Sequence, residues 1–448
     1  MRFLLLNQFY PPDSAPTGQY LHDLGKVLVE RGHQVRVLCS RRSYNGEDAF
    51  PARETRDGVE IIRLAATGFG RRGFAGKLAD YATFYSSLFA ALVSERGKAD
   101  VILSLTTPPY IGLLGKWAAW RHGCRHAHWI MDLYPDVMFA HGMARKNSLL
   151  FRFLQRLTRY QLRGSQFVLA LGPMMAAKVD QYWVGEGQVT GGRKQATGDS
   201  EISTFHFPLS TFHPHPSIHD SRFTTHDSRF TTLHLPLWSN SALSPWPDHQ
   251  PNPLRVERGW KESEPVFLYS GNMGLGHRFG EFLEAARQLG ASGPRWVFAG
   301  GGKRRAEVES FALANPAVRI EFLDYAPHSQ LCAHLCAADV HLASLDSAWQ
   351  GLMVPSKLQG SFAVGRPVLY VGGRNCETAA WIEESGGGWV VPENDLPALL
   401  AAIKQACNPS EFRARGLAAR RFAENHFCKS SNCAQIAEWM EGAREKQK

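Results

Sequence analysis

The sequence predicts an α/β protein made of two doubly wound domains in tandem, and three observations support this fold class. Short apolar segments alternate with stretches of helical periodicity over residues 1–184, which is the pattern of a parallel sheet covered by helices. The same alternation returns within residues 236–425. A chain of 448 residues is also too long for one ordinary hydrophobic core.

In the first domain, uncharged apolar runs mark most of the strands. We expect strands at 3–6, 34–39, 60–64, 101–105, 126–131 and 167–171. A helix is expected at 19–31, where Tyr20, Leu24 and Leu28 recur at helical spacing and Gly32 ends the pattern.

The second domain repeats this order of elements. Strands are expected at 266–270, 296–299, 320–323, 340–343 and 368–371, and helices at 278–289, 304–314, 328–337 and 395–407. Residues 426–448 should form a final amphipathic helix.

Between the domains, residues 185–235 have a different composition. The heptapeptide His-Asp-Ser-Arg-Phe-Thr-Thr occurs twice in tandem, from His219 and from His226. The period of seven does not indicate a coiled coil, because no apolar seam exists and Pro208 and Pro214 interrupt any helix. We expect a low-complexity, mostly disordered insertion, whose repeat-driven histidines have no rigid frame to bind metal.

Composition narrows the possible partners. The chain is 44% hydrophobic and 20% charged, as in soluble globular proteins, and its net charge is +9. Lys and Arg are spread along the chain and no nucleic-acid-binding module can be recognised, so we expect no nucleic-acid partner. The N-terminus lacks the features of a secretory signal, no apolar run could span a membrane, and the eight cysteines are scattered. A cytoplasmic protein with reduced thiols is expected.

Residues 351–372 predict a site for an anion. Pro355 and Ser356 suit the first turn of a short helix, and Gly365 suits its end before a buried strand. The free N–H groups and positive end of such a helix favour an anion, and Lys357 adds a formal charge at the same place. A nucleotide-type ligand follows from this arrangement.

A second glycine-rich loop follows the first strand of the second domain. Gly271, Asn272 and Gly274 allow backbone N–H groups to face a phosphate, and His277 and Arg278 follow as charge partners. The alternative is a loop that only turns, with Arg278 facing solvent.

Two residues of the first domain are further candidates. Gly18 is expected in the loop after the first strand, where glycine lets the backbone approach a diphosphate, unless it is a plain turn glycine. Asp132 closes the strand expected at 126–131. It either orients an acceptor hydroxyl or stabilises charge, or it caps a helix that begins near Pro135.

Four motifs in order resemble the retaining, family 4 glycosyltransferases of GT-B architecture, in which two Rossmann-like domains face each other across a cleft. The branch resembled acts in capsule, exopolysaccharide and lipopolysaccharide assembly. The motifs are Tyr10-Pro-Pro with Gly18, His22-Asp and Gly32-His-Gln-Val; Asp132-Leu-Tyr-Pro; Tyr269-Ser-Gly-Asn-Met-Gly; and Pro355-Ser-Lys with Gly365-Arg-Pro-Val. The resemblance covers nearly all of the chain outside 185–235.

The sequence departs from this family at one pair of residues. Many members carry two glutamates eight residues apart, and here those positions are Leu352 and Gly360. The resembled branch commonly lacks the second glutamate too. Glu377 is a candidate substitute for contact with the sugar. The resemblance implies that transfer needs no bound metal and no other cofactor, with Lys357, helix dipoles and Arg278 stabilising the leaving nucleoside diphosphate.

The resemblance implies transfer of a hexosyl or N-acetylhexosaminyl group from a nucleotide-sugar to a lipid-linked or saccharide acceptor. It also implies that the last helix returns to the first domain. Two alternatives stay open: a nucleotide-sugar epimerase on the same fold, and a non-catalytic partner of another transferase.

Basic and aromatic residues mix in two segments of the first domain, 69–93 and 145–163. Such segments can rest on an anionic inner-membrane face, or they can be helices whose stripe faces the core.

Overall fold

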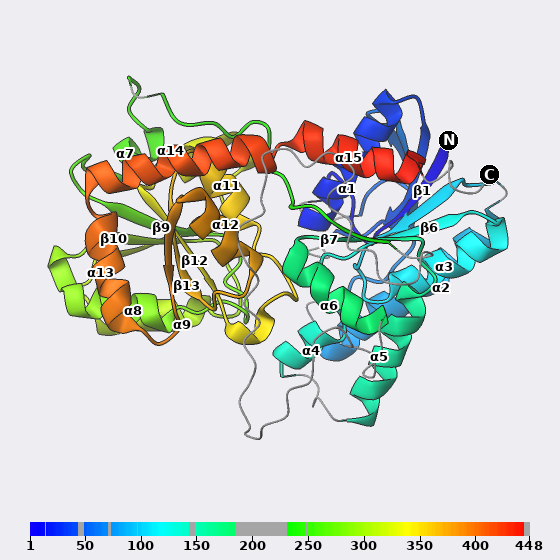
Figure 1. Ribbon diagram of the computed structural model, residues 1–448, viewed down its shortest axis with the longest axis horizontal. Coiled ribbons are helices and arrows are strands. Elements are labelled where there is room, and N and C mark those ends of the chain that lie inside the picture. The colour runs from blue at the N-terminus through cyan, green and yellow to red at the C-terminus, as the bar shows by residue number, and fades with distance from the viewer. Residues whose placement is uncertain are drawn as a thin grey trace, which may run out of the picture.

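The structure is a computed structural model that describes residues 1–13, 15–43, 49–69, 73–95, 97–142, 148–183, 231–247 and 249–442. Figure 1 shows two α/β domains side by side, with two C-terminal helices running across both. Each domain has its own sheet, as the sequence predicts.

The first domain is built on an eight-stranded sheet in which all neighbouring strands are parallel except β3 and β4. In sheet order the strands are β3 (Arg53–Arg56), β4 (Val59–Leu64), β2 (Gln34–Ser40), β1 (Arg2–Leu6), β5 (Val101–Ser104), β6 (Arg125–Trp129), β7 (Phe167–Ala170) and β8 (Thr231–His234). The helices are α1 (Pro16–Glu30), α2 (Phe74–Ser94), α3 (Ile111–His122), α4 (Asp136–Ala140), α5 (Leu149–Leu162) and α6 (Pro173–Trp183).

Strand β1 shows why this sheet needs helices on both faces. Phe3 and Leu5 belong to one buried cluster, which includes residues of α1, while Leu4 and Leu6 belong to another, which includes residues of α2 and α3. Successive side chains of a strand point to opposite faces, so an uninterrupted apolar run is buried only between two layers.

The second domain has a six-stranded, fully parallel sheet in the order β11-β10-β9-β12-β13-β14. The strands are β9 (Val266–Ser270), β10 (Arg295–Ala299), β11 (Ile320–Leu323), β12 (Val340–Leu345), β13 (Val368–Gly372) and β14 (Gly388–Val391). Its helices are α7 (Pro253–Arg258), α8 (Gly280–Leu289), α9 (Arg305–Ala314), α10 (Leu331–Cys336), α11 (Lys357–Ala363), α12 (Glu377–Ser385), α13 (Leu396–Ala406) and α14 (Pro409–His426).

Strand order reverses between β9 and β12, and in the first sheet between β1 and β5. In open sheets of this kind ligands bind outside the carboxyl ends of the strands at such a reversal. The topology therefore places one candidate site on each domain.

The C-terminal helix α15 (Lys429–Gly442) packs against α1 of the first domain. The Glu441 carboxylate binds both Arg31 and His33, and Lys429 Nζ lies 2.6 Å from Asp23 Oδ1. Asp23 also accepts a hydrogen bond from the Trp238 indole. The segment that enters the second domain and the helix that leaves it are thus fixed to one aspartate.

Residues 231–234 differ from the expectation. They belong to the range expected as an insertion, 185–235, yet they form β8 and pair with β7. Residues 184–230, which include most of that range, lie outside the described residues. Two further strands, β3 and β14, were not expected.

Candidate donor and acceptor sites

A cradle of glycines and one lysine lies at the carboxyl end of β9. Gly271 has φ = 131°, in a region that disfavours other residues, and a Cβ there would lie 3.1 Å from Lys357 Cε. Lys357 comes from the start of α11, on the loop side of the neighbouring strand β12. The structure therefore brings two predicted residues, separated by 86 positions in the sequence, into contact.

His277 holds the Lys357 amine. The Lys357 Nζ lies 3.1 Å from His277 Nε2, and His277 Nδ1 lies 2.7 Å from the carbonyl oxygen of Ser344. The carbonyl can only accept, so Nδ1 carries the ring proton and Nε2 accepts from the lysine. Burial lowers the pKa of His277 to about 3, and burial lowers the pKa of Lys357 to about 7.

A neighbouring glycine turn, Gly300–Gly302, supports this loop and was not predicted as part of a site. Met273 N donates to Gly301 O, and Gly302 has φ = 130°. A Cβ on Gly302 would overlap Asn272 Oδ1 and the backbone of Met273. The two glycine turns are thus packed backbone to backbone. Asn272 itself is exposed, and a Cβ on Gly274 would lie 3.3 Å from the Asn272 amide nitrogen.

The helix after Pro355 is short, so its dipole contributes little positive charge. Helix α11 has seven residues, and Ser356 is its N-cap residue without a side-chain hydrogen bond to the helix. Pro355 is buried and Ser356 is exposed. Gly365, with φ = 68°, ends the helix as expected. The positive charge at this end comes mainly from Lys357.

Arg278 does not lie free beside the cradle. Its guanidinium pairs with Glu281, Asp346 and Glu393, and it also donates to Asn394. Three carboxylates already pair with the guanidinium, and the expected role of Arg278 as a charge partner for phosphate stays a prediction.

Gly18 lies in the first turn of α1, not in the preceding loop. A Cβ on Gly18 would lie 2.8 Å from the Phe9 carbonyl oxygen and 3.1 Å from Tyr10 Cα. The helix can approach the Tyr10-Pro-Pro loop this closely only because the side chain is absent.

Asp132 follows β6 and lines a small pocket at the carboxyl edge of the first sheet. The pocket is lined also by Thr106, Tyr110, His128, Tyr134, Thr158, Gln161 and neighbouring apolar residues. Burial raises the pKa of Asp132 to about 6. The helix that follows begins at Asp136 with Pro135 as its N-cap, so the alternative role of Asp132 as a helix cap is wrong.

The loop after Asp132 contacts the second domain. Leu133 N donates to Leu352 O at 3.0 Å, and the rings of His141 and Trp349 lie 4.4 Å apart. Leu352 is one of the two positions where the resembled family carries glutamate. Glu377 is buried at the same domain boundary, where it accepts a hydrogen bond from Met175 N of α6.

Two kinds of feature are absent from the residues that the structure describes. In that part of the chain no helix is both long and apolar enough to cross a membrane. Within the same ranges, His, Cys, Asp and Glu side chains do not gather in threes at metal-binding distance.

Two doubly wound domains in tandem, with an anion cradle on one and a carboxylate pocket on the other, fit a glycosyltransferase of GT-B type. Family models agree: a glycosyl transferase 4-like domain matches residues 17–190, and a glycosyl transferases group 1 domain matches residues 264–408. The chain belongs to the family-4-type glycosyltransferases that carry this pair of domains.

Two curated proteins are similar to this chain along most of its length. The probable glycosyltransferase WbjE of Pseudomonas aeruginosa is 23% identical over 326 residues, which cover 72% of this chain and 70% of WbjE. The putative colanic acid biosynthesis glycosyl transferase WcaI of Escherichia coli is 23% identical over 426 residues, which cover 91% and 92% of the two chains.

Solved structures share the fold. A sucrose-phosphate synthase from Thermosynechococcus elongatus superposes with a TM-score of 0.70 at 16% identity, with all of both chains covered. Anabaena HepE in complex with UDP-glucose superposes with a TM-score of 0.63 at 13% identity, covering 99% of this chain and 100% of HepE. The predicted GT-B architecture is therefore confirmed.

Proposed function

We propose that this glycosyltransferase moves a hexosyl or N-acetylhexosaminyl group from a nucleotide-sugar to a lipid-linked or saccharide acceptor in cell-surface polysaccharide synthesis, with retention of configuration. The observation that carries the proposal is the Lys357 amine, held by His277 against the Gly271 turn at the strand-order reversal. The similarity to WcaI, a putative colanic acid biosynthesis glycosyl transferase, supports a role in polysaccharide synthesis. The similarity to HepE, solved in complex with UDP-glucose, supports a nucleotide-sugar as the donor.

In this proposal the diphosphate of the donor lies on the Gly271–Gly274 turn. Lys357 donates to a phosphate oxygen, and its charge stabilises the negative charge that develops on the leaving nucleoside diphosphate. His277 stays neutral at physiological pH and orients the amine. Because Lys357 supplies this charge, we propose that transfer needs no divalent metal and no other cofactor.

The acceptor lies on the first domain in this proposal. The Asp132 carboxylate, whose pKa burial raises to about 6, accepts a hydrogen bond from the attacking hydroxyl and orients it toward the donor. We assign no sugar contact to Glu377, because its carboxylate is engaged by α6, and none to Arg278.

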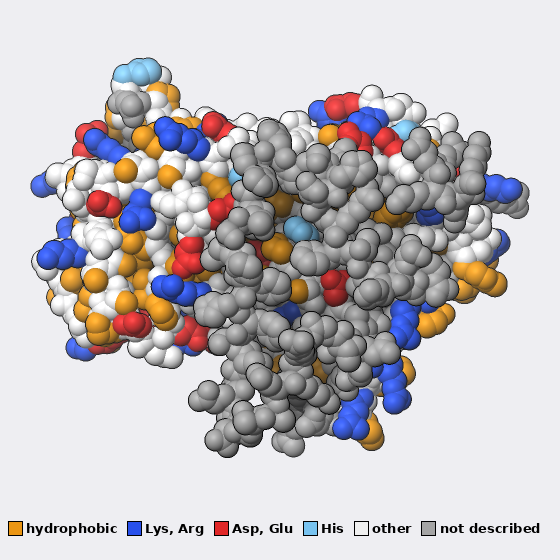
Figure 2. Space-filling model, in the orientation of Figure 1, with side chains coloured by type: hydrophobic (Ala, Val, Ile, Leu, Met, Phe, Trp, Pro, Cys, Tyr) orange, Lys and Arg blue, Asp and Glu red, His pale blue; other side chains and the backbone are white. Residues whose placement is uncertain are grey.

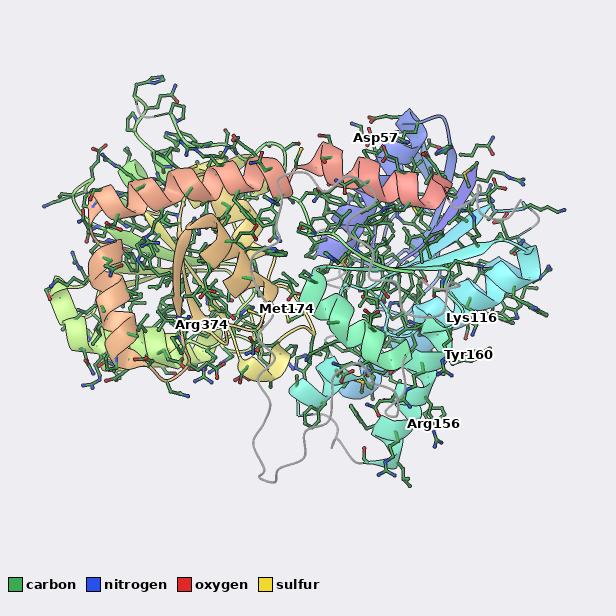
Figure 3. The ribbon with its side chains drawn as sticks, in the orientation of Figure 1. Asp57, Lys116, Arg156, Tyr160, Met174 and Arg374 are labelled. Atoms are coloured by element: carbon green, nitrogen blue, oxygen red, sulfur yellow. The ribbon has the colours of Figure 1, made fainter. Side chains whose placement is uncertain are left out.

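We further propose that α5 rests on an anionic membrane, which would bring a lipid-linked acceptor to the first domain. Its exposed face carries Leu149, Leu150 and Phe153 together with Arg152 and Arg156. Figure 2 shows basic and hydrophobic side chains side by side along the edge where α5 lies, and Figure 3 labels Arg156 there. Arginines among exposed apolar side chains fit an anionic lipid surface. This would place the enzyme in the cytoplasm at the inner membrane face.

A test of the donor site compares Lys357→Ala with Lys357→Arg, using Lys404→Ala as an exposed control lysine in the same domain. Loss of one charge that contacts the leaving group costs about 3 kcal/mol, so we expect turnover with Lys357→Ala to fall at least hundredfold with the fold intact. Lys357→Arg should retain part of the activity, and Lys404→Ala nearly all of it.

Activity is measured with and without a chelator, after a thermal-shift screen has found the donor. Near-normal transfer by Lys357→Ala contradicts the donor site, and loss of wild-type activity in chelator, restored by magnesium, contradicts metal-free transfer. Donor turnover without any acceptor would identify an epimerase instead.

A further inference from the structure

Glu377 belongs to one domain and is bound by the other. It is the first residue of α12 in the second domain, and its Oε1 accepts a 2.7 Å hydrogen bond from Met175 N, in the first turn of α6 in the first domain. The two residues are 202 positions apart, and Glu377 is 1% exposed. Figure 3 labels Met174, beside Met175, where the two domains meet.

Burial and the neighbouring hydrogen-bond donors act on this carboxylate in opposite directions, and the net result is a raised pKa. The carboxylate lies at the N-terminal ends of α12 and α6, where the Met175 N–H donates to it and the positive dipole ends favour its charged form. Burial raises the pKa of Glu377, while the N–H groups of Met175 and Met174 and the charge of Lys178 act to lower the pKa. The second oxygen, Oε2, is buried and has no hydrogen-bond partner among the described residues.

The first domain leaves space for this side chain. Gly172, just before α6, would overlap Glu377 Cγ if it carried a Cβ. Glycine is thus required here by a side chain of the other domain and not by its own backbone conformation, because its φ lies outside the left-handed region.

We propose that Glu377 is a positioning residue that holds the two domains in the arrangement needed for transfer, by capping α6 across the boundary. Lys357 and Asp132 lie on opposite domains, so their separation depends on how the domains are held. Trp238 and Lys429 fix the second domain at Asp23, on the α15 side, and the Leu133–Leu352 hydrogen bond adds a contact between loops. The Glu377 cap adds a direct link between the start of a helix in one domain and the start of a helix in the other. This inference goes beyond the proposed function, since it concerns domain arrangement and not a substrate contact.

The experiment compares Glu377→Ala, Glu377→Gln and Gly172→Ala in the full chain, with Glu384→Ala as an exposed control on the same helix. For Glu377→Ala we expect kcat to fall at least tenfold with little change in the donor KM. Hydrogen exchange in 172–178 should speed up, and the radius of gyration from X-ray scattering should increase. Glu377→Gln, whose amide oxygen can still accept from Met175 N, should recover most of kcat.

Formate separates a cap from a substrate contact. The cavity left by Glu377→Ala lies between two helix N-termini, so added formate should restore kcat and slow exchange. Gly172→Ala keeps the carboxylate but excludes it sterically, and formate should not rescue it.

Unchanged exchange in 172–178 for Glu377→Ala would overturn the proposal. So would a loss of activity without any change in exchange or scattering, because Glu377 would then act on substrate. Because donor KM is measured for every variant, failure of the donor site remains distinguishable from failure of this inference.

Discussion

At the scale of single residues, Lys357 and His277 set the ionisation of the donor site. Burial places the pKa of Lys357 at about 7, so a substantial part of the ligand-free protein carries a neutral lysine at physiological pH. His277 cannot replace the lost charge, because its pKa is lowered to about 3. The positive charge for a diphosphate therefore depends on one titrating amine.

A pH profile tests this dependence. We expect kcat/KM for the donor to fall as pH rises through about 7, because the free enzyme loses the Lys357 proton there. Lys357→Arg should move this alkaline limb beyond the measurable range. A wild-type profile that stays flat from pH 6 to 9 would contradict the assignment.

The lowered pKa of Lys357 also determines how the free energy of unfolding changes with pH. The lysine of the unfolded chain has its usual pKa of 10.5, so between about pH 7 and 10.5 the unfolded state binds more protons and the free energy of unfolding rises with pH. Below about 7 both states are protonated and the destabilisation is fully present. Lys357→Met should lack this rise in denaturant unfolding measured across the same range.

Single residues also show what a sequence can and cannot reveal about a site. The Gly271 turn, His277 and Lys357 carry local signals, namely their positions after strands and at a helix start, and the structure places them in contact. Arg278 carried the same kind of signal, but Glu281, Asp346 and Glu393 converge on it from three different elements. No local pattern predicts such convergence, nor the contact of Glu377 with α6.

At the scale of elements, burial accounts for most of the strands that were predicted, although β14 is buried and was not expected. Strands covered on both faces, such as β1 and β13, were predicted because nearly every residue is apolar. Strand β3 reads Arg-Glu-Thr-Arg with no buried residue, and β8 lies in the low-complexity range, so neither has an apolar run. Edge strands gain their order from a neighbour and leave little trace in their own composition.

Helix α5 can be tested as a membrane contact. Its exposed arginines are worth roughly 1 kcal/mol each near an anionic surface, so the wild-type protein should float with anionic vesicles at low salt and less at high salt. Arg152→Glu with Arg156→Glu should abolish flotation, and so should Leu149→Ser with Phe153→Ser. Of the other basic residues in the two segments, Arg71, Arg72, Arg145 and Lys146 lie outside the described residues, and Lys77 is exposed on α2.

The matched control reverses two exposed charges on the second domain, Lys404→Glu with Arg421→Glu, which gives the same change in net charge. It should float as the wild type does. Equal loss of flotation in this control would show that only net charge matters, and a wild-type protein that stays in solution would remove the membrane contact from the proposal.

At the scale of the whole molecule, the sequence predicts the order of the two domains and a segment of different composition between them. It does not predict where that segment ends, because β8 lies within the range expected as an insertion. Deleting 190–226 should leave folding and transfer largely unchanged, because the repeats and prolines there cannot build a core and a short connection to β8 remains. Thermal unfolding and turnover measure the result.

A second deletion, 190–234, is the matched comparison. It also removes β8 and uncovers β7, so it should lower the unfolding temperature clearly. Equal behaviour of the two deletions would show that β8 contributes nothing. A cooperative loss of folding in the shorter deletion would show that the removed residues pack.

The double attachment at Asp23 matters to anyone who builds hybrid enzymes. Both the entry segment at Trp238 and the exit helix at Lys429 are tied to the first domain, so the second domain is a cassette inserted between two fixed points and not a C-terminal appendage. A chimera made by one crossover after residue 238 would import a foreign α15 onto α1. Two crossovers, one at each tie, would exchange donor preference while leaving the acceptor domain with its own last helix.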